Sequence, residues 1–158
     1  MANNIEVVKN LFEKHIAGTL EKAIVSDVTI SICKLTKTVN KQMELLFECD
    51  CRVYINTRVL QHLYDKKPAE EFAFIVDNVH KIAKYPDCIY KNKDPKRGDV
   101  CFTKRIGGEN YMCSLEMCER EDGSARELFV VTSFRIRKEN YLNNYELLWS
   151  WRDDTLSS

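Results

Sequence analysis

The side chains best suited to chemistry are a histidine, a lysine and a hydroxyl residue. Histidine titrates near neutrality without any perturbation, so His62 could donate or accept a proton. Lys104 lies between the apolar residues Phe102 and Ile106, each two residues away. Because alternate residues of a strand share a face, its side chain is predicted to point toward the core. Thr132 lies in an apolar run and could donate a hydrogen bond. Together these groups could transfer protons and stabilise a developing negative charge.

Cationic and polar residues nearby are candidates for binding an anion. Arginine offers a bidentate fork to a phosphate, whereas lysine acts as a point charge. Because no second histidine falls in this region, Glu116 or Lys104 would have to supply the other proton step. The candidate substrate-binding residues are Arg105, Ser133, Arg135 and Arg137.

Each candidate also has a purely structural explanation. His62 is spaced to pair with Arg58 or Asp65 on one helix. Lys104 could extend its ammonium to solvent from the end of a strand, and Thr132 is a good strand former. The arginines could form a solvated sheet edge that discourages aggregation.

Three extended segments are expected to carry the lysine and the hydroxyl, namely residues 99–106, 110–118 and 127–137. Gly107-Gly108 accepts positive φ at both positions of a two-residue turn, and Asp122-Gly123 marks the second turn. Turns centred there predict an antiparallel meander with two rows across it. These rows are Lys104, Tyr111 and Phe134, and then Phe102, Cys113 and Thr132. The opposite face would carry Arg105, Ser114, Glu116, Phe129, Val131, Ser133 and Arg135.

The remaining elements are expected to cover or extend this meander. Apolar periodicity predicts helices that begin near Asn3 or Asn4, at Thr57 and at Pro68. Alternation predicts strands over residues 26–32 and 42–55, which could extend the meander or form a separate hairpin. A terminal helix is expected over residues 140–151.

Composition limits the class of protein. The chain has 158 residues, of which 44% are hydrophobic, and its 24 basic residues equal its 24 acidic ones. No overall field would attract a polyanion, so such a site must be local. Seven cysteines without a Cys-x-x-Cys pair make a zinc site unexpected. Without a basic leader or a long apolar run, we expect a cytoplasmic protein with no cofactor and no membrane contact.

Four short stretches, taken in order, resemble a known family. They are Thr57-Arg-Val-Leu-Gln-His62, Tyr85-Pro-Asp-Cys-Ile-Tyr90, Phe102-Thr-Lys104 and Leu128-Phe-Val-Val-Thr-Ser-Phe134. The sequence resembles the phage-associated nucleases of the barnase, EndoU, colicin E5/D and RelE-like group. The resemblance implies an α+β fold with helices followed by an antiparallel sheet. We therefore expect one α+β domain over 1–151, with 1–52 outside the resemblance, a nuclease-like core at 53–149 and a frayed tail at 152–158.

The resemblance also implies an activity and assigns roles by position. Members of the group cleave RNA without a metal, by attack of a 2′-hydroxyl on the adjacent phosphate. His62 matches the helical histidine, Lys104 the basic residue of an early strand, and Thr132 or Ser133 the hydroxyl of a late strand. The substrate would be tRNA or mRNA, and the protein would be a phage or mobile-element effector or toxin with a protein antitoxin.

Two other functions stay open at this point. Neutral charge and a single well-placed histidine favour a non-enzymatic interaction or inhibitor module on a nuclease-like scaffold. A small-ligand pocket between the sheet and the helices, lined by Tyr111, Phe102 and Phe134, is the third.

Overall fold

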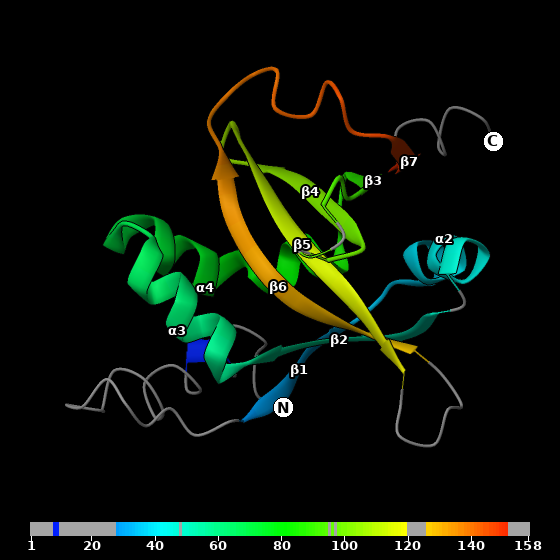
Figure 1. The fold of residues 1–158 in the computed structure, drawn as a ribbon, viewed down its shortest axis with the longest axis horizontal. Helices are drawn as coiled ribbons and strands as arrows, with labels where there is room; N and C mark the ends of the chain where they lie inside the picture. The colour runs from blue at the N-terminus through cyan, green and yellow to red at the C-terminus, as the bar shows by residue number, and fades with distance from the viewer. Residues whose placement is uncertain are drawn as a thin grey trace.

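Three consecutive antiparallel strands form the middle of the sheet, as the sequence predicted (Figure 1). They are β4 (Val100–Ile106), β5 (Glu109–Glu119) and β6 (Arg126–Ile136). Gly107 and Gly108 join β4 to β5 with φ of 59° and 84°, the positive values that a two-residue hairpin turn needs. The computed structural model describes residues 8–9, 28–47, 49–94, 96, 98–119 and 126–151.

The register of β5 with β6 changes along the strands because of a β-bulge. Near the turn the pairs follow the predicted register, up to Leu115 opposite Val130. Beyond a shift between Ser114 and Leu115, every pair is displaced by one residue. Tyr111 is therefore paired with Arg135, and the predicted pairing of Tyr111 with Phe134 is wrong.

This shift exchanges the two faces of the sheet at the end of β6. Ser133, not Thr132, completes the row of Phe102 and Cys113. Because a displacement of one residue turns each side chain to the other side, Thr132 and Phe134 leave the face that was predicted for them. Ser133 and Arg135 take their places.

The earlier strands extend the same sheet and do not form a separate hairpin. β1 (Thr29–Lys34) pairs antiparallel with β2 (Cys49–Asn56), and β2 pairs in parallel with β6, with Val53 opposite Leu128. The strand order across the seven-stranded sheet is β1-β2-β6-β5-β4-β3-β7. The sequence had not predicted β3 (Cys88–Lys91).

The predicted terminal helix over 140–151 is wrong. Its first part forms turns, and β7 (Leu147–Ser150) pairs with β3 at the sheet edge. Trp149 is placed opposite Ile89, which buries its ring. The helical spacing of the aromatic residues was real, but pairing at a free sheet edge outweighed this weak local preference.

The predicted strand over 42–55 is wrong in its first half. Residues Lys37–Phe47 form helix α2, and the strand begins at Cys49. The Val39 N–H donates to the Thr36 side chain at 3.3 Å, which caps the helix. Val39 and Met43 are four residues apart and are both buried, so they lie on the buried face of α2. This helical spacing was present in the same stretch of sequence as the alternation that predicted a strand.

The middle two helices begin where the sequence placed them. Asn56 caps α3 (Thr57–Lys66), accepting from the Val59 N–H at 2.9 Å, and α4 (Ala69–Lys84) follows Pro68. Leu60 and Leu63 of α3 are buried, whereas Tyr64 is 51% exposed.

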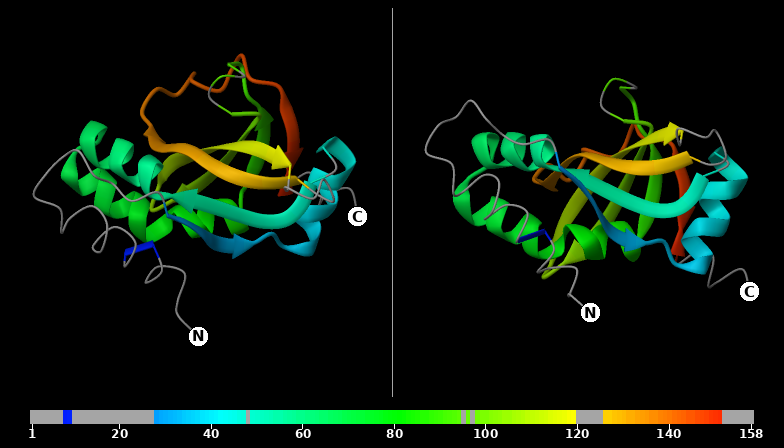
Figure 2. Two further views of the ribbon diagram at one scale, coloured as in Figure 1. Left: turned by 60° about the horizontal axis from the view of Figure 1, so that its bottom comes forward. Right: turned by 90° about the horizontal axis from the view of Figure 1, so that it is seen from below.

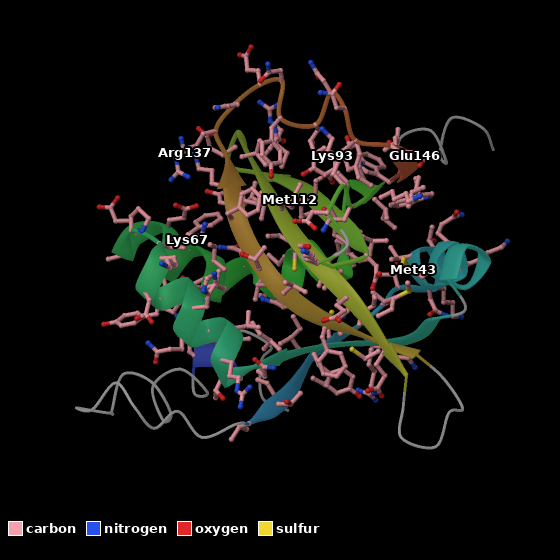
Figure 3. All side chains as sticks on the ribbon, in the orientation of Figure 1. Met43, Lys67, Lys93, Met112, Arg137 and Glu146 are labelled. Carbon is pink, nitrogen blue, oxygen red and sulfur yellow. The ribbon has the colours of Figure 1, made fainter. Side chains whose placement is uncertain are left out.

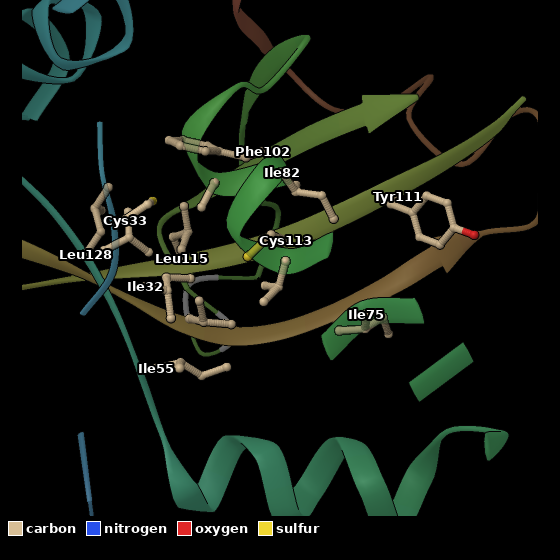
Figure 4. Packing of buried hydrophobic residues seen from close by; sticks show 14 of the residues in the cluster. Ile32, Cys33, Ile55, Ile75, Ile82, Phe102, Tyr111, Cys113, Leu115 and Leu128 are labelled. Carbon is tan, nitrogen blue, oxygen red and sulfur yellow. The ribbon is translucent and has the colours of Figure 1, made fainter. Parts of the chain in front are cut away.

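Helix α4 covers one face of the sheet and gives it a core (Figures 1 and 4). The ring of Phe74 stacks on Tyr111 with centroids 4.5 Å apart. We call this side the helix face; from the register, β4, β5 and β6 contribute Val100, Phe102, Lys104, Tyr111, Cys113, Leu115, Ser133 and Arg135 to it. The other side is the outer face, with Cys101, Met112, Ser114, Glu116, Phe129, Thr132 and Phe134.

The predicted N-terminal helix falls outside the described residues except for Val8 and Lys9. Val8 is buried, and the ammonium of Lys9 lies 3.0 Å from the carboxylate of Asp77 on α4. Across the described parts of the chain, no helix is long and apolar enough to cross a membrane.

Candidate functional site

A groove on the outer face brings two hydroxyl residues together. Ser114 and Thr132 are directly opposite each other on β5 and β6, and both line a hollow of about 120 Å³. Within the described residues the Thr132 hydroxyl has no hydrogen-bond partner. The remaining lining residues are Asn92, Lys93, Asp94, Cys101, Met112, Phe134, Tyr141 and Tyr145.

The loop between β3 and β4 forms one rim of the groove and is fixed to its floor. The side-chain amide of Asn92 donates to the Ser114 hydroxyl at 3.1 Å. The Asp99 carboxylate accepts from the Met117 N–H at 2.8 Å. Gly98 has φ of 113°, and a Cβ there would lie 2.8 Å from the Ser114 oxygen. Only glycine lets the loop approach so closely, which holds Lys93 at the rim.

Aromatic rings form the other wall, supplied mainly by the segment that follows β6. Tyr141 packs edge-on against Phe134 at 5.8 Å and stacks with Tyr145 at 5.7 Å. Tyr90 of β3 lies edge-on to Tyr145 at 6.4 Å. Figure 2 shows this segment and α4 on opposite sides of the sheet. A row of rings beside polar groups is suited to holding planar, polar ligands.

Two lysines bring positive charge to this wall. The ammonium of Lys67, just after α3, lies 5.2 Å from the centre of the Phe134 ring, and that of Lys93 lies 4.9 Å from Tyr145. Figure 3 shows the two lysines on opposite sides of Met112. The chain is neutral overall, and the groove carries both signs of charge, because Asp94 lines it beside Lys93.

Glu116 supplies a carboxylate on the same face. It is two residues from Ser114 on β5, and alternate residues of a strand share a face. Its side chain is exposed, opposite Phe129. A carboxylate in this position can accept a proton from a group bound beside Thr132.

Lys104 does not belong to this groove. It lies on the helix face, where its ammonium donates to the Tyr85 carbonyl at 2.8 Å and lies 3.6 Å from the Asp87 carboxylate. Lys104 and Thr132 therefore lie on opposite faces of the sheet. The sequence argument placed them together because it had no signal for the bulge in β6.

His62 lies on α3 with an exposed side chain. Its imidazole forms no hydrogen bond with any residue that the structure describes. Asp65, one of the partners considered from spacing, instead accepts from the Gln61 side chain at 2.9 Å. The structure thus divides the three predicted catalytic residues among the outer face, the helix face and the surface of α3.

The predicted substrate-binding residues also separate. Ser133 is fully buried and donates to the Met112 carbonyl at 2.8 Å, and Arg135 lies 3.5 Å from the Glu109 carboxylate. Arg105 and Arg137 line a polar hollow of about 430 Å³ near the β4–β5 turn. Sequence reasoning missed Asn92, Lys93 and Tyr145 as groove residues, and Lys67 beside the Phe134 ring. The tyrosines and the basic loop of residues 91–98 were the signals that could have indicated them.

Glu71 fixes the end of β6 against the start of α4. Its carboxylate accepts from the Arg137 guanidinium at 2.7 Å and from the Arg135 N–H at 3.0 Å. Burial raises the pKa of Glu71, but these hydrogen bonds and the charges of Arg137 and Lys67 outweigh burial and leave the pKa below its ordinary value. Arg137 is thereby committed to a structural pair.

The groove's thiol and one of its phenols stay protonated near neutrality. Burial raises the pKa of Cys101 to about 11, and burial together with Cys88 raises the pKa of Tyr90 to about 12. Cys101 is therefore no nucleophile. Over the described ranges, no three His, Cys, Asp or Glu side chains are placed to share a metal ion.

Fold and groove together define a small α+β protein with a polar groove, walled by aromatic rings, on the outer face of its sheet. Residues 31–144 match the family model described as phage-Barnase-EndoU-ColicinE5/D-RelE like nuclease3. The chain belongs to this nuclease family. The match begins within β1 and so includes α2 and β2, ahead of residue 53 where the resemblance in short motifs begins. No curated protein and no solved structure matched.

Proposed function

We propose that this protein is an endoribonuclease that cleaves RNA without a metal ion, in the groove on the outer face. The observation that carries the proposal is the Thr132 hydroxyl, which has no hydrogen-bond partner in the described structure and lies opposite Ser114 in a groove lined by Lys93 and aromatic rings. Membership of the nuclease family supports a nucleic-acid substrate.

The proposed reaction is an internal transfer of the phosphate. A base removes the proton of the 2′-hydroxyl, and the new P–O2′ bond forms as the P–O5′ bond breaks. The departing 5′ oxygen takes a proton from an acid, which leaves a 2′,3′-cyclic phosphate and a 5′-hydroxyl. This route uses the hydroxyl that distinguishes RNA from DNA.

Residues in and around the groove are assigned to these steps by their positions. Glu116 is the base, because its carboxylate is exposed on the face that carries Thr132. The Thr132 hydroxyl donates to a non-bridging phosphate oxygen, and Lys93 supplies positive charge from the rim. His62, which could donate or accept a proton, lies outside the groove on α3, and we assign it the role of acid because Lys67, just after this helix, lies 5.2 Å from the centre of the Phe134 ring in the groove wall. The rings of Tyr141 and Tyr145 support unpaired bases.

The proposed biological role is that of a phage-encoded effector that acts on cellular RNA such as tRNA or mRNA, with a protein inhibitor as partner. The family description refers to phage and to colicin and RelE-like nucleases, and it supports this role.

The test is incubation of the purified protein with total RNA and with DNA, both in EDTA. We expect cleavage of RNA only. Intact RNA at stoichiometric protein would refute the enzyme and favour an interaction module on the same scaffold. His62→Gln tests the acid: we expect kcat to fall about 100-fold with unchanged thermal stability. Full activity in this variant would transfer the acid role to the phenols of Tyr141 and Tyr145, whose oxygens are 3.4 Å apart.

A further inference from the structure

A second pocket lies away from the groove, where α2, the turn after α4 and the end of β7 meet. Its volume is about 410 Å³, within the range of small-molecule sites. None of the residues that line the groove takes part in it. The lining residues are Thr36, Thr38, Val39, Lys84, Tyr85, Pro86, Asp87, Lys104, Trp149 and Trp151.

Exposed aromatic rings mark this pocket as a binding site. Tyr85 is 53% exposed and Trp151 is 43% exposed, although both belong to short, ordered segments next to the sheet edge. The Asp87 carbonyl accepts from the Trp151 N–H at 3.1 Å, so the backbone that carries this ring is fixed. The Lys84 ammonium lies 5.5 Å from the centre of the Tyr85 ring, so exposed rings and positive charge occur together in this hollow.

The charges around the rings favour an anion. Lys84 and Lys104 line the pocket, and Asp87 offsets only one of them. The N-terminus of α2 also faces the pocket through Thr36, Thr38 and Val39, and its first turn contains no acidic residue. The N-terminal end of a helix dipole attracts phosphate and carboxylate groups.

Trp149 provides an independent indication of a missing acceptor. Its ring lines the pocket and is only 9% exposed, and its indole N–H is buried with no hydrogen-bond partner among the residues that the structure describes. Buried donors in proteins are almost always paired, so this N–H is a donor to which a ligand oxygen in the pocket could bind.

We propose that this pocket binds a nucleoside monophosphate, either free or as the phosphorylated end of an RNA chain. The base packs against Tyr85 and Trp151, and the phosphate lies between Lys84 and the start of α2. A ligand of this kind combines the flat ring and the negative charge that the lining requires. The site is separate from the proposed active site and does not depend on its activity.

Intrinsic fluorescence reports on this pocket directly, because both tryptophans of the chain line it. Excitation at the red edge of the tryptophan band avoids absorption by nucleotides. We expect AMP, GMP or UMP to change the emission in a saturable way. Adenosine, which lacks the anion, and inorganic phosphate, which lacks the ring, should have no effect at the same concentrations.

Two lysines of α4 provide a matched pair. Lys84→Met should weaken nucleotide binding about tenfold, because it removes one charged contact. Lys81→Met, an exposed position one turn away on the same helix, should leave binding unchanged. Equal binding by the Lys84→Met variant, or an equal response to adenosine, would overturn the proposal.

Short oligonucleotides distinguish the two possible ligands, a free nucleotide and the phosphorylated end of an RNA chain. They are added to the Thr132→Val protein so that they stay intact. A response to a 5′-phosphorylated trinucleotide, but not to its 5′-hydroxyl form, assigns the site to RNA ends. A response to mononucleotides alone assigns it to a free nucleotide. Stronger binding by an acidic aromatic peptide than by any nucleotide would overturn the proposal in favour of a protein partner.

Discussion

Ser114 and Thr132 are opposite each other on β5 and β6, immediately beyond the bulge that changes the register of these strands. Without the bulge, Thr132 would lie beneath α4 in the row of Phe102 and Cys113. The extra residue instead turns the Thr132 hydroxyl to the outer face, beside Ser114 and on the side that carries Glu116. The proposed active site depends on this one local irregularity.

The first prediction separates two neighbouring hydroxyls. Thr132→Val keeps the shape of the side chain and removes the donor, so kcat for RNA should fall about 100-fold with little change in melting temperature. Ser133→Ala removes a buried hydrogen bond to Met112 and should cost about 1 kcal/mol of stability while cleavage is retained. Loss of activity in Ser133→Ala alone would place the site on the helix face.

Glu116 provides the second prediction. Glu116→Gln should lower kcat by about 100-fold or more, because the amide cannot accept the proton of the 2′-hydroxyl. The matched control is Glu109→Gln on the same strand, where the carboxylate lies 3.5 Å from Arg135 on the helix face. Initial rates on a short RNA measure both. Equal rates for the two variants would remove Glu116 as the base.

The third prediction concerns Lys93 and salt. Lys93→Met should raise KM for RNA and reduce the salt dependence of binding by about 0.7 in the log–log slope, since one phosphate contact is lost. Lys81→Met, at an exposed position on α4 across the sheet from the groove, serves as the control. An unchanged slope in the Lys93 variant would show that its ammonium does not contact the RNA backbone.

Two glycines give a matched test of the rim. Gly98→Ala puts a Cβ 2.8 Å from the Ser114 oxygen at φ of 113°, so it should cost about 1–3 kcal/mol and displace Lys93. Gly108→Ala has φ of 84° but meets no atom within 4 Å, so only the backbone cost applies. Cleavage should fall further in Gly98→Ala, measured with folded protein well below its melting temperature. A larger loss in Gly108→Ala would contradict the role of the rim.

The pair of Glu71 and Arg137 predicts how stability changes with pH. In the folded protein the pKa of Glu71 lies below its unfolded-state value of about 4.5. The ionised carboxylate therefore stabilises the fold at pH values above 4.5, and this contribution is lost as the pH falls through the folded-state pKa. Glu71→Gln should therefore be about 1–3 kcal/mol less stable at neutral pH. Denaturant titrations at pH 7 and pH 3 should show the difference from wild type shrinking in acid. A constant difference would mean that the carboxylate charge is unimportant.

The sequence predicted those elements whose local signals agree with the tertiary structure. Asn56 before a periodic apolar run, Pro68 with its acidic first turn, and the pair Gly107-Gly108 each specify a backbone geometry. The predictions from the sequence were wrong where contacts between residues far apart in the chain decide the secondary structure. The periodicity of residues 140–151 is helical, yet Leu147–Ser150 pairs with β3, and alternation hid the Val39 and Met43 face of α2.

The site was harder to predict than the fold. Thr132, Glu116 and the basic loop were recognisable as polar groups near strands, but their grouping depends on the bulge, which has no reliable sequence signal. Lys104 was chosen as a candidate because a lysine on the apolar face of a strand is unusual. Its explanation is local: it bridges the Tyr85 carbonyl and the Asp87 carboxylate at the end of α4.

The most direct test of the central claim uses a short RNA and the same RNA with one 2′-deoxy sugar at the main cleavage site, both in EDTA, analysed by mass spectrometry. The wild-type protein should cut the all-ribose strand to a 2′,3′-cyclic phosphate and a 5′-hydroxyl, should leave the 2′-deoxy site intact, and should lose this activity in the Thr132→Val variant. Cleavage at the 2′-deoxy site, or undiminished cleavage by Thr132→Val, would contradict 2′-hydroxyl attack in the outer-face groove.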